Sequence, residues 1–356
     1  MKRMLLFATI FIWVIGCKKS SNTLPTNPPV VDTLPTPTGT TFTNPLLLSG
    51  PDHWVIKKDS FYYYTHTLGN SIALWRTTKM SNLKDAQKIT VWTAPAISEY
   101  NNDVWAPELH FINNKWYLYF AADNGNNASH RIYVLENITA DPLSDNWTFK
   151  GKVADTAADK WAIDASEFEF NGQLYLIWSG WAGDTDGRQD IYIAPMSNPW
   201  TISGARVLIA SPAFDWEKVG GPTYVNEGPE AITNSAGNLF ITFSASGCWT
   251  DNYCLGLLTL KTGGNPLAAM DWTKTKTPVF GTLESSGTYG PGHNGFFKSA
   301  DGTQDWIIYH ANNLKGQGCG AARNPRIQQF TWNNDGSPNF GTPLHINTPT
   351  KKPSGE

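Results

Sequence analysis

Three carboxylates occupy comparable places in three similar segments of the chain. Asp52, Asp164 and Glu227 each lie near the start of a segment and are followed, after a short turn, by a strand rich in aromatic residues. A fold that arranges such segments in a circle brings the three carboxylates to one axis. Hydrolysis of a glycosidic bond needs one carboxyl group as an acid and another as a base. The pattern therefore predicts a glycoside-cleaving site.

Each carboxylate taken singly also has a simpler interpretation. Asp52 and Asp164 could be turn residues, because aspartate is common where strands begin. Glu227 precedes Gly-Pro and could lie exposed on a loop. The shared placement of all three in successive segments is what favours catalysis.

The elements that must position these residues recur along the chain. Each module has a turn marked by Gly, Pro or polar residues, an apolar strand, an Asn-Gly or Asp-Gly type of turn, an aromatic strand and a third strand. Five modules start near Asp52, Trp105, Asp164, Glu227 and His293. Strands of this length with a repeat of roughly 50 to 65 residues indicate a propeller. We therefore predict an all-β fold, a five-bladed β-propeller, with equivalent residues converging at one end of the channel.

The order of the carboxylates around the predicted ring of blades predicts the stereochemistry of the hydrolysis. Asp52 on the first blade and Glu227 on the fourth are not neighbours, which suits the separation of about 6.5–9.5 Å that leaves room for a water molecule and gives inversion. Asp164 on the intervening blade would keep the acid protonated near neutral pH through like-charge repulsion.

Composition narrows the class of ligand. The 356 residues include 16 Trp, 13 Tyr and 17 Phe, and flat aromatic faces stack on sugar rings, although strand-rich proteins also favour aromatic residues. The formal net charge is -3, and the chain has no basic stripe with interleaved aromatics. Nucleic acid is therefore not an expected partner.

The first residues indicate export. Lys2 and Arg3 precede an apolar run, residues 4–15, that is too short to span a bilayer and is typical of a signal peptide. The segment ends at Cys17 and resembles a bacterial lipoprotein box, in which that cysteine carries the lipid. A stray cysteine after a conventional signal peptide is the alternative. Since Lys18 and not Asp follows Cys17, the resemblance favours an outer-membrane lipoprotein, with either face of that membrane possible.

The rest of the chain divides by composition. Residues 18–43 are rich in Pro, Thr and Ser and form the expected flexible tether. Residues 44–350 form the expected propeller, and 351–356 a C-terminal tail. Cys248, Cys254 and Cys319 allow one disulfide and one spare thiol, with the pairing open, and their spacing does not favour zinc.

Five short motifs, in order, resemble glycoside hydrolase family 43. They are Pro-Asp-His-Trp-Val-Ile at 51–56, Trp-Ala-Pro-Glu at 105–108, Ala-Ile-Asp at 162–164, Glu-Gly-Pro at 227–229 and Gly-Pro-Gly-His-Asn at 290–294. The likeness covers roughly residues 44–348. The family comprises inverting arabinofuranosidases, arabinanases and xylosidases on a five-bladed propeller.

The resemblance implies a role for each carboxylate. Asp52 would be the general base, Asp164 the residue that tunes the pKa and orientation of the acid, and Glu227 the general acid. Many members have Asp-Pro at the first site, whereas this chain has Asp52-His53. That departure leaves the carboxylate in place and changes the neighbouring wall of the pocket.

Further residues are candidates for binding. His293 resembles the family's axial histidine and would help to hold Ca²⁺ through mostly water ligands, with a neutral core histidine as the alternative. Arg323 would contact sugar hydroxyls, or lie on the surface. Trp54 and Trp105 would stack on sugar rings, or pack in the core. Glu108 is a candidate to hydrogen-bond the sugar. We expect no organic cofactor.

The leading hypothesis is an inverting, exo-acting α-L-arabinofuranosidase that acts on arabinan or arabinoxylan. A β-xylosidase, an exo-arabinanase or a β-galactofuranosidase would use the same carboxylate geometry, and the pocket loops decide among them. A hypothesis of another class is a surface glycan-binding lipoprotein that has lost its chemistry. The linkage, the length of the substrate and the oligomeric state stay open.

Overall fold

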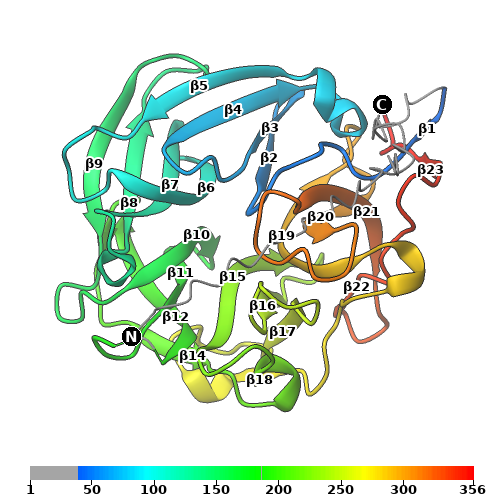
Figure 1. Ribbon diagram of the computed structural model, residues 1–356. Coiled ribbons are helices and arrows are strands. Elements are labelled where there is room, and N and C mark those ends of the chain that lie inside the picture. Colours follow the sequence, from blue (N-terminus) through cyan, green and yellow to red (C-terminus); the bar gives the residue numbers. More distant parts are fainter. Residues whose placement is uncertain (1–38, 186) are drawn as a thin grey trace, which may run out of the picture. The chain divides into compact units, whose positions relative to one another are not determined.

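Antiparallel strands joined by tight turns make up almost all of the regular structure. The computed structural model describes residues 39–185 and 187–356. Within these ranges the strands group into sheets that radiate around one centre (Figure 1). The turns between paired strands contain residues that readily adopt left-handed backbone conformations. Asn113, Asn171 and Gly172 are examples, and all three have positive φ.

Five blades succeed one another along the chain, each numbered from its innermost strand outward. The first blade has β2 (Trp54–Lys58), β3 (Phe61–Thr65), β4 (Ser71–Thr77) and β5 (Gln87–Thr93). The second has β6 (Asn102–Ile112), β7 (Lys115–Asp123), β8 (Arg131–Asn137) and β9 (Trp147–Val153). The third has β10 (Ala162–Phe170), β11 (Gln173–Gly180), β12 (Arg188–Asn198) and β14 (Val207–Ala210), with β13 (Thr201–Ile202) beside β12. The fourth has β15 (Tyr224–Thr233), β16 (Leu239–Ala245), β17 (Cys254–Leu260) and β18 (Trp272–Lys274), and the fifth has β19 (Tyr289–Lys298), β20 (Asp305–Asn312), β21 (Asn324–Trp332) and β22 (Pro338–Asn339).

In the described part of the chain, helical structure is confined to short 3₁₀ turns in the connections. They are η1 (Met80–Asp85), η2 (Asn127–Ser129), η3 (Asp215–Glu217), η4 (Ala269–Asp271) and η5 (Glu284–Ser286).

The innermost strands form the wall of the central channel. Each of β2, β6, β10, β15 and β19 contacts the next, and β19 returns to β2, so the ring is closed. A short parallel pairing of β12 with β15 also joins the third sheet to the fourth. The fold is therefore a five-bladed β-propeller, as predicted. The outer strand of each blade is an addition, because the repeating module read from the sequence had only three strands.

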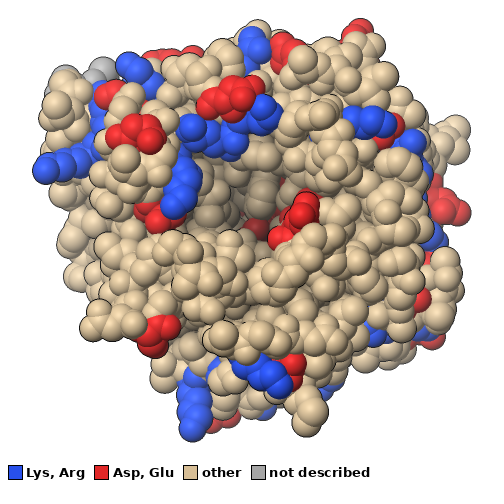
Figure 2. Space-filling view, turned by 180° about the vertical axis from the view of Figure 1, so that it is seen from behind, with Lys and Arg blue, Asp and Glu red and all other residues tan. Residues whose placement is uncertain are grey.

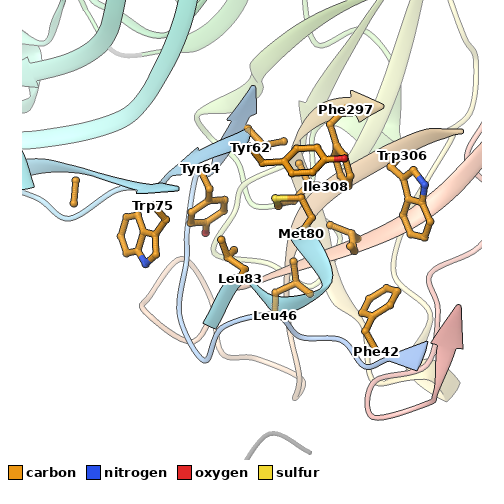
Figure 3. Packing of buried hydrophobic residues seen from close by; sticks show 13 residues of the cluster. Phe42, Leu46, Tyr62, Tyr64, Trp75, Met80, Leu83, Phe297, Trp306 and Ile308 are labelled. Atoms are coloured by element: carbon orange, nitrogen blue, oxygen red, sulfur yellow. The ribbon is translucent and has the colours of Figure 1, made fainter. Parts of the chain in front are cut away.

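Aromatic and aliphatic side chains fill the spaces between blades. Figure 3 shows the cluster at the junction of the first and fifth blades, where Tyr62 and Tyr64 of β3 lie near Phe297, Trp306 and Ile308. The rings of Tyr62 and Phe297 meet edge to face, with centroids 5.6 Å apart. Burial of each such side chain stabilises the fold by about 1.5–3 kcal/mol, so this junction is a major part of ring closure.

Residues near the two ends of the described chain make contacts that help to close the ring. β1 (Thr41–Phe42) pairs with β23 (Thr350–Lys351). The buried side chain of Asn44 donates to the carbonyl of Ile327 and accepts from its N–H, at 2.9 and 3.0 Å. At the other end, the Glu356 carboxylate accepts hydrogen bonds from the backbone N–H groups of Met80 and Ser81.

These contacts correct two predicted boundaries. Thr41 and Phe42, which the prediction placed in the tether of residues 18–43, belong to the fold, and Phe42 is buried. The tail, residues 351–356, likewise contributes a strand residue and the anchor at Glu356. The predicted signal peptide, Cys17 and the tether up to residue 38 lie outside the described residues. In the two described ranges, no helix has the length and apolar character needed to cross a membrane.

Replacement of Asn44 by alanine tests the ring-closing contacts. Asn44→Ala removes both hydrogen bonds to Ile327 and leaves buried backbone groups unpaired, so the free energy of unfolding should fall by about 2–4 kcal/mol. Thermal unfolding should show a midpoint lower by several degrees. The control is Asn252→Ala, which alters an exposed residue and should leave the midpoint within a degree. Equal midpoints for the two variants would contradict this account of closure.

Candidate active site

A cavity of about 420 Å³ brings the three predicted carboxylates together. Asp52, Asp164 and Glu227 all line it, although they come from the first, third and fourth blades. A space-filling view of one face of the molecule shows a hollow near its centre, with acidic side chains beside it (Figure 2). The predicted convergence of residues far apart in the chain is therefore present.

A repeated backbone irregularity places these residues. A residue in the left-handed region occurs just before the inner strand of the first blade and within the inner strand of each other blade. These residues are Asp52, Ala106, Asp164, Gly228 and His293, with φ between 44° and 54°. In the second to fifth blades this residue lies within a break of the strand register. Such bulges bend a strand and re-aim its side chains, and they are frequent beside active sites.

The fourth blade shows why glycine follows the glutamate. Gly228, and not Glu227, holds the left-handed position equivalent to Asp52 and Asp164. A Cβ atom on Gly228 would lie 3.2 Å from Nδ1 of His293, which is closer than most side-chain contacts allow. Glycine therefore lets the fourth and fifth inner strands approach, with the Glu227 side chain one residue before the equivalent place.

Asp52 is held as an ionised group. Its carboxylate accepts hydrogen bonds from Arg323, at 2.5 Å between Oδ1 and Nη1, and from the Thr67 hydroxyl at 3.0 Å. Burial alone would raise the pKa of Asp52, but the charge of Arg323 and the hydrogen bonds from Arg323 and Thr67 oppose it, and the pKa is lowered. Thr67 is fixed in turn, because its hydroxyl accepts from the N–H of Ala106 on the second blade. Asp52 is thus a base over the whole neutral range.

Glu227 has the opposite character. Burial raises its pKa to about 7, and the negative charge of Asp52 adds to the effect, while a hydrogen bond from the Tyr253 hydroxyl at 2.8 Å opposes it. Tyr253 can reach Glu227 because Gly292 has no side chain: a Cβ there would lie 2.2 Å from the tyrosine ring. Glu227 therefore holds a proton up to about neutral pH and can donate it.

Asp164 is the third carboxyl group that lines the cavity. Burial raises its pKa well above the ordinary value, and the charges of Glu227 and Asp52 raise it further. One carboxylate oxygen accepts the N–H of Gly228 at 2.9 Å, so Asp164 also fixes the backbone that carries Glu227. The predicted role of Asp164, to tune the pKa and orientation of the acid, stays a prediction, and these two contacts are the observations that bear on it.

The other predicted site residues divide into two groups. Arg323, Trp105 and His293 line the cavity. Trp54 and Glu108 are not among the described residues that line it. The Trp54 indole donates to the carbonyl of Leu109 and stacks on His110, which is the core-packing alternative.

Glu108 belongs to a second, buried polar cluster, made of Glu108, His110, Glu167 and Glu230. His110 lies 2.9 Å from Glu108 and 3.5 Å from Glu167, measured from nitrogen to oxygen. Burial alone would lower the pKa of His110, but its hydrogen bonds to both glutamates raise it to about 9. Burial and Glu108 raise the pKa of Glu230 well above its ordinary value. The predicted sugar contact of Glu108 stays a prediction, and its observed partners are protein groups.

Sequence reasoning missed much of the cavity wall. Trp161 and Trp181 lie face to face, with ring centroids 4.9 Å apart, and line the cavity beside Ile163. Trp249, 48% exposed, lines it as well. The abundance of Trp pointed to such a wall, but the strand periodicity could not separate wall residues from core residues.

The cysteines also contribute to the cavity. Cys248 and Cys319 form a disulfide and both line the cavity, whereas Cys254 is a buried free thiol. This resolves the pairing that the sequence left open.

His293 offers one metal-ligating atom and little support from neighbours. Its ring lies 3.7 Å from Asp52 and stacks against His310, and burial lowers its pKa, which keeps it neutral and able to bind a cation. No group of three or more His, Cys, Asp or Glu side chains with metal-binding geometry occurs in the part of the chain that the structure describes. The donor set does not form a protein cage, so any cation at His293 would have to keep mostly water ligands.

Comparison with known proteins identifies the family. The sequence profile described as "Glycosyl hydrolases family 43" matches residues 42–338, nearly the whole propeller. The chain belongs to glycosyl hydrolase family 43. The extent of this family 43 match agrees with the observed ring, which begins at β1 and includes all five blades.

Three relatives in family 43 place the chain more closely. An extracellular exo-α-(1→5)-L-arabinofuranosidase of Streptomyces avermitilis is 42% identical over 325 residues, which cover 89% of this chain and 66% of that enzyme. Alpha-L-arabinofuranosidase 43 of Humicola insolens is 36% identical over 312 residues, which cover 85% and 64%. The chain thus spans just under two thirds of the length of these two relatives. The crystal structure of an α-L-arabinofuranosidase from Lactobacillus brevis superposes with a TM-score of 0.80 at 37% identity, covering 86% of this chain and 98% of that one.

Proposed function

We propose that the protein is an inverting, exo-acting α-L-arabinofuranosidase that removes terminal arabinofuranosyl groups from arabinan or arabinoxylan. The observation that carries the proposal is the convergence of an ionised carboxylate, Asp52, and a proton-holding carboxyl group, Glu227, on one cavity. An acid and a base with separated pKa values at one site are what glycoside hydrolysis requires. The arabinofuranosidase relatives support the choice of sugar.

The proposed mechanism uses each carboxyl group once. Glu227 donates its proton to the glycosidic oxygen as the leaving group departs. Asp52 takes a proton from a water molecule that attacks the anomeric carbon from the opposite side, so the configuration inverts. Asp164 would tune the acid through the electrostatic interaction between the two carboxyl groups, and its hydrogen bond from Gly228 supports a role in holding the adjacent backbone.

The cavity walls have the character that a furanose ring needs. Trp105, Trp161, Ile163 and Trp181 supply an apolar surface, and Thr67, Gln189 and Arg323 supply polar groups. A small pocket with apolar walls and a few directed polar groups fits a single terminal sugar better than the middle of a chain. This favours exo action.

A panel of aryl glycosides tests the substrate. We expect release of 4-nitrophenol from the α-L-arabinofuranoside, and proton NMR should show the released L-arabinose first as the β-furanose, the inverted anomer, before mutarotation. Cleavage of the β-D-xyloside alone would identify a xylosidase in its place. Binding of oligosaccharide with no release of any sugar would favour the glycan-binding alternative.

Glu227→Gln separates catalysis from binding. Glutamine keeps the size and most hydrogen bonds of the acid but has no proton to donate, so kcat should fall by roughly 10²–10⁴-fold. Affinity for an arabino-oligosaccharide, measured by calorimetry, should change little. Glu99→Gln, an exposed glutamate, is the matched control and should keep full turnover. A Glu227→Gln protein with normal kcat would exclude this residue as the acid.

The pH profile follows from the two pKa shifts. As pH rises through about 7, Glu227 loses the proton that it must donate, so kcat/KM should fall on the basic side near that value. As pH falls through the lowered pKa of Asp52, the base becomes protonated, so the acidic limb should lie below the usual aspartate range. Tyr253→Phe removes a hydrogen bond that lowers the pKa of Glu227, so its basic limb should move to higher pH. A basic limb that stays in place would show that Glu227 does not set it.

We propose further that His293 helps to hold a Ca²⁺ ion that keeps most of its water ligands. The neutral ring of His293 at the cavity supports this, and the lack of a surrounding cage in the described residues predicts weak binding. Elemental analysis of protein dialysed against Ca²⁺ should find about one ion per chain, and His293→Ala should lose it. No ion in the wild type, with no change in the unfolding midpoint on chelation, would remove the proposal.

The chain's location is proposed from residues outside the structure. We infer a lipoprotein anchored to the outer membrane through Cys17, on the basis of the lipoprotein-like sequence before it. The relative from Streptomyces avermitilis is an extracellular enzyme, which agrees with export. An anchored enzyme with a long tether would act on polysaccharide fragments near the membrane.

A further inference from the structure

The Cys248–Cys319 disulfide joins two blades at the cavity itself. Cys248 lies in the connection between β16 and β17 of the fourth blade, and Cys319 in the connection between β20 and β21 of the fifth. Their Cα atoms are 5.2 Å apart, and both residues line the cavity together with Arg323. The bond is therefore part of the pocket wall as well as a link between blades.

The β20–β21 connection needs such a link. It contains Gly316, Gly318 and Gly320, and the first two have positive φ, so its backbone has wide conformational freedom. Two links hold it to the fourth blade: the disulfide, and the Asp251 carboxylate, which accepts the N–H of Gly316 at 2.9 and 3.1 Å. Both contacts come from one short segment, residues 248–251.

A short path leads from the disulfide to Asp52. Gly320, which follows Cys319, accepts hydrogen bonds at 3.3 Å from both the backbone N–H and the Nε of Arg323. The guanidinium of Arg323 then binds the Asp52 carboxylate. A displacement of Cys319 would move Gly320, and with it the group that holds Asp52 in place.

We propose that the Cys248–Cys319 disulfide is a positioning element for catalysis, which holds Arg323 against the base Asp52. This rests on the proposed function only for its kinetic readout. Arg323 hydrogen-bonds Asp52, the proposed base that activates the attacking water. Displacement of Arg323 should therefore disturb the orientation of Asp52 in the transition state more than it weakens the binding of the sugar. The disulfide thus acts on turnover through Arg323 and is more than a brace for the fold.

The free thiol Cys254 supplies the matched control. It is buried in β17, and burial raises its pKa to about 12, so it is a poor partner for thiol exchange with the disulfide. Cys254→Ala should leave both the disulfide and turnover within about twofold of the wild type.

A mutant cycle tests the path. Cys248→Ala with Cys319→Ala should lower kcat on the aryl arabinofuranoside by at least tenfold and change KM by less than about threefold, at temperatures well below unfolding. In an Arg323→Ala background the same pair of changes should lower kcat by less than twofold, because the group on which the disulfide acts is already gone. An unchanged kcat in the first variant, or an equal fall in both backgrounds, would overturn the proposal.

Reduction gives the same test without substitution. Dithiothreitol converts the disulfide to two thiols and is itself oxidised to its cyclic disulfide. It should lower kcat of the wild type and of Cys254→Ala equally, and have no effect on the variant that lacks Cys248 and Cys319. Loss of turnover in that last variant would point to another target and contradict the proposal.

Hydrogen exchange keeps the inference testable if no glycoside is cleaved. Without the disulfide, the amides of residues 313–323 and of the segment around Asp52 should exchange faster, while those of β7 (Lys115–Asp123) should not change. Unchanged exchange around Asp52 would overturn the positioning role. Inactivity of the wild type on every glycoside would overturn the proposed function alone.

Discussion

The ion pair between Asp52 and Arg323 links the chemistry of the site to the closure of the ring. The two residues are 271 positions apart in the chain and belong to the first and fifth blades. They can meet only when β19 packs against β2 and the aromatic cluster of Figure 3 fills the junction. The charge of Arg323 opposes the effect of burial on the pKa of Asp52 and so favours the ionised form that the proposed base needs. The circular fold is therefore a condition for catalysis as well as a solution to the problem of exposed strand edges.

The same cavity forces its carboxyl groups into different protonation states. Three like charges buried together repel one another strongly, so the group with the cationic partner keeps its charge and the others hold protons. Asp52 is bound by Arg323, whereas the hydrogen bonds that Glu227 and Asp164 accept within the described residues come from uncharged groups, the Tyr253 hydroxyl and the Gly228 N–H. The proposed division of roles between base and acid thus depends on which blades lie next to each other.

The sequence predicted the parts of this arrangement that repeat. Turn residues and apolar periodicity are local properties of the sequence. They predicted the inner three strands of every blade, the number of blades and the carboxylates near the starts of three of them. The outer strands were missed because they are short or partly exposed, as in β5, where polar residues such as Gln87 and Lys88 hide the strand pattern. Trp54 and Glu108 were placed in the pocket because they belong to the motifs at the starts of the first and second blades. A shift of one residue along a bulged strand turns a side chain away from the cavity and toward other parts of the protein. Sequence spacing does not show such a shift.

Long-range pairings could not be predicted from the sequence for a different reason. Three cysteines permit three pairings, and only the packing of the fourth blade against the fifth brings Cys248 and Cys319 together while burying Cys254. The polar cluster around His110 is of the same kind, since its members come from β6, β10 and β15. The sequence gives the type of each residue, whereas the packing of the blades around the ring determines which residues it contacts.

The cluster around His110 extends the electrostatic argument beyond the cavity. Glu108 contributes to the raised pKa of Asp164, and Asp164 contributes to that of Glu230, so the two groups of acids interact. His110, with a pKa raised to about 9, carries a positive charge between Glu108 and Glu167 and offsets part of their charge. A fully ionised cluster would add repulsion to a cavity that must keep Asp52 charged. The protonated imidazolium and the protonated Glu230 therefore limit the negative charge of the channel, which lets one carboxylate at its mouth stay ionised beside two that hold protons.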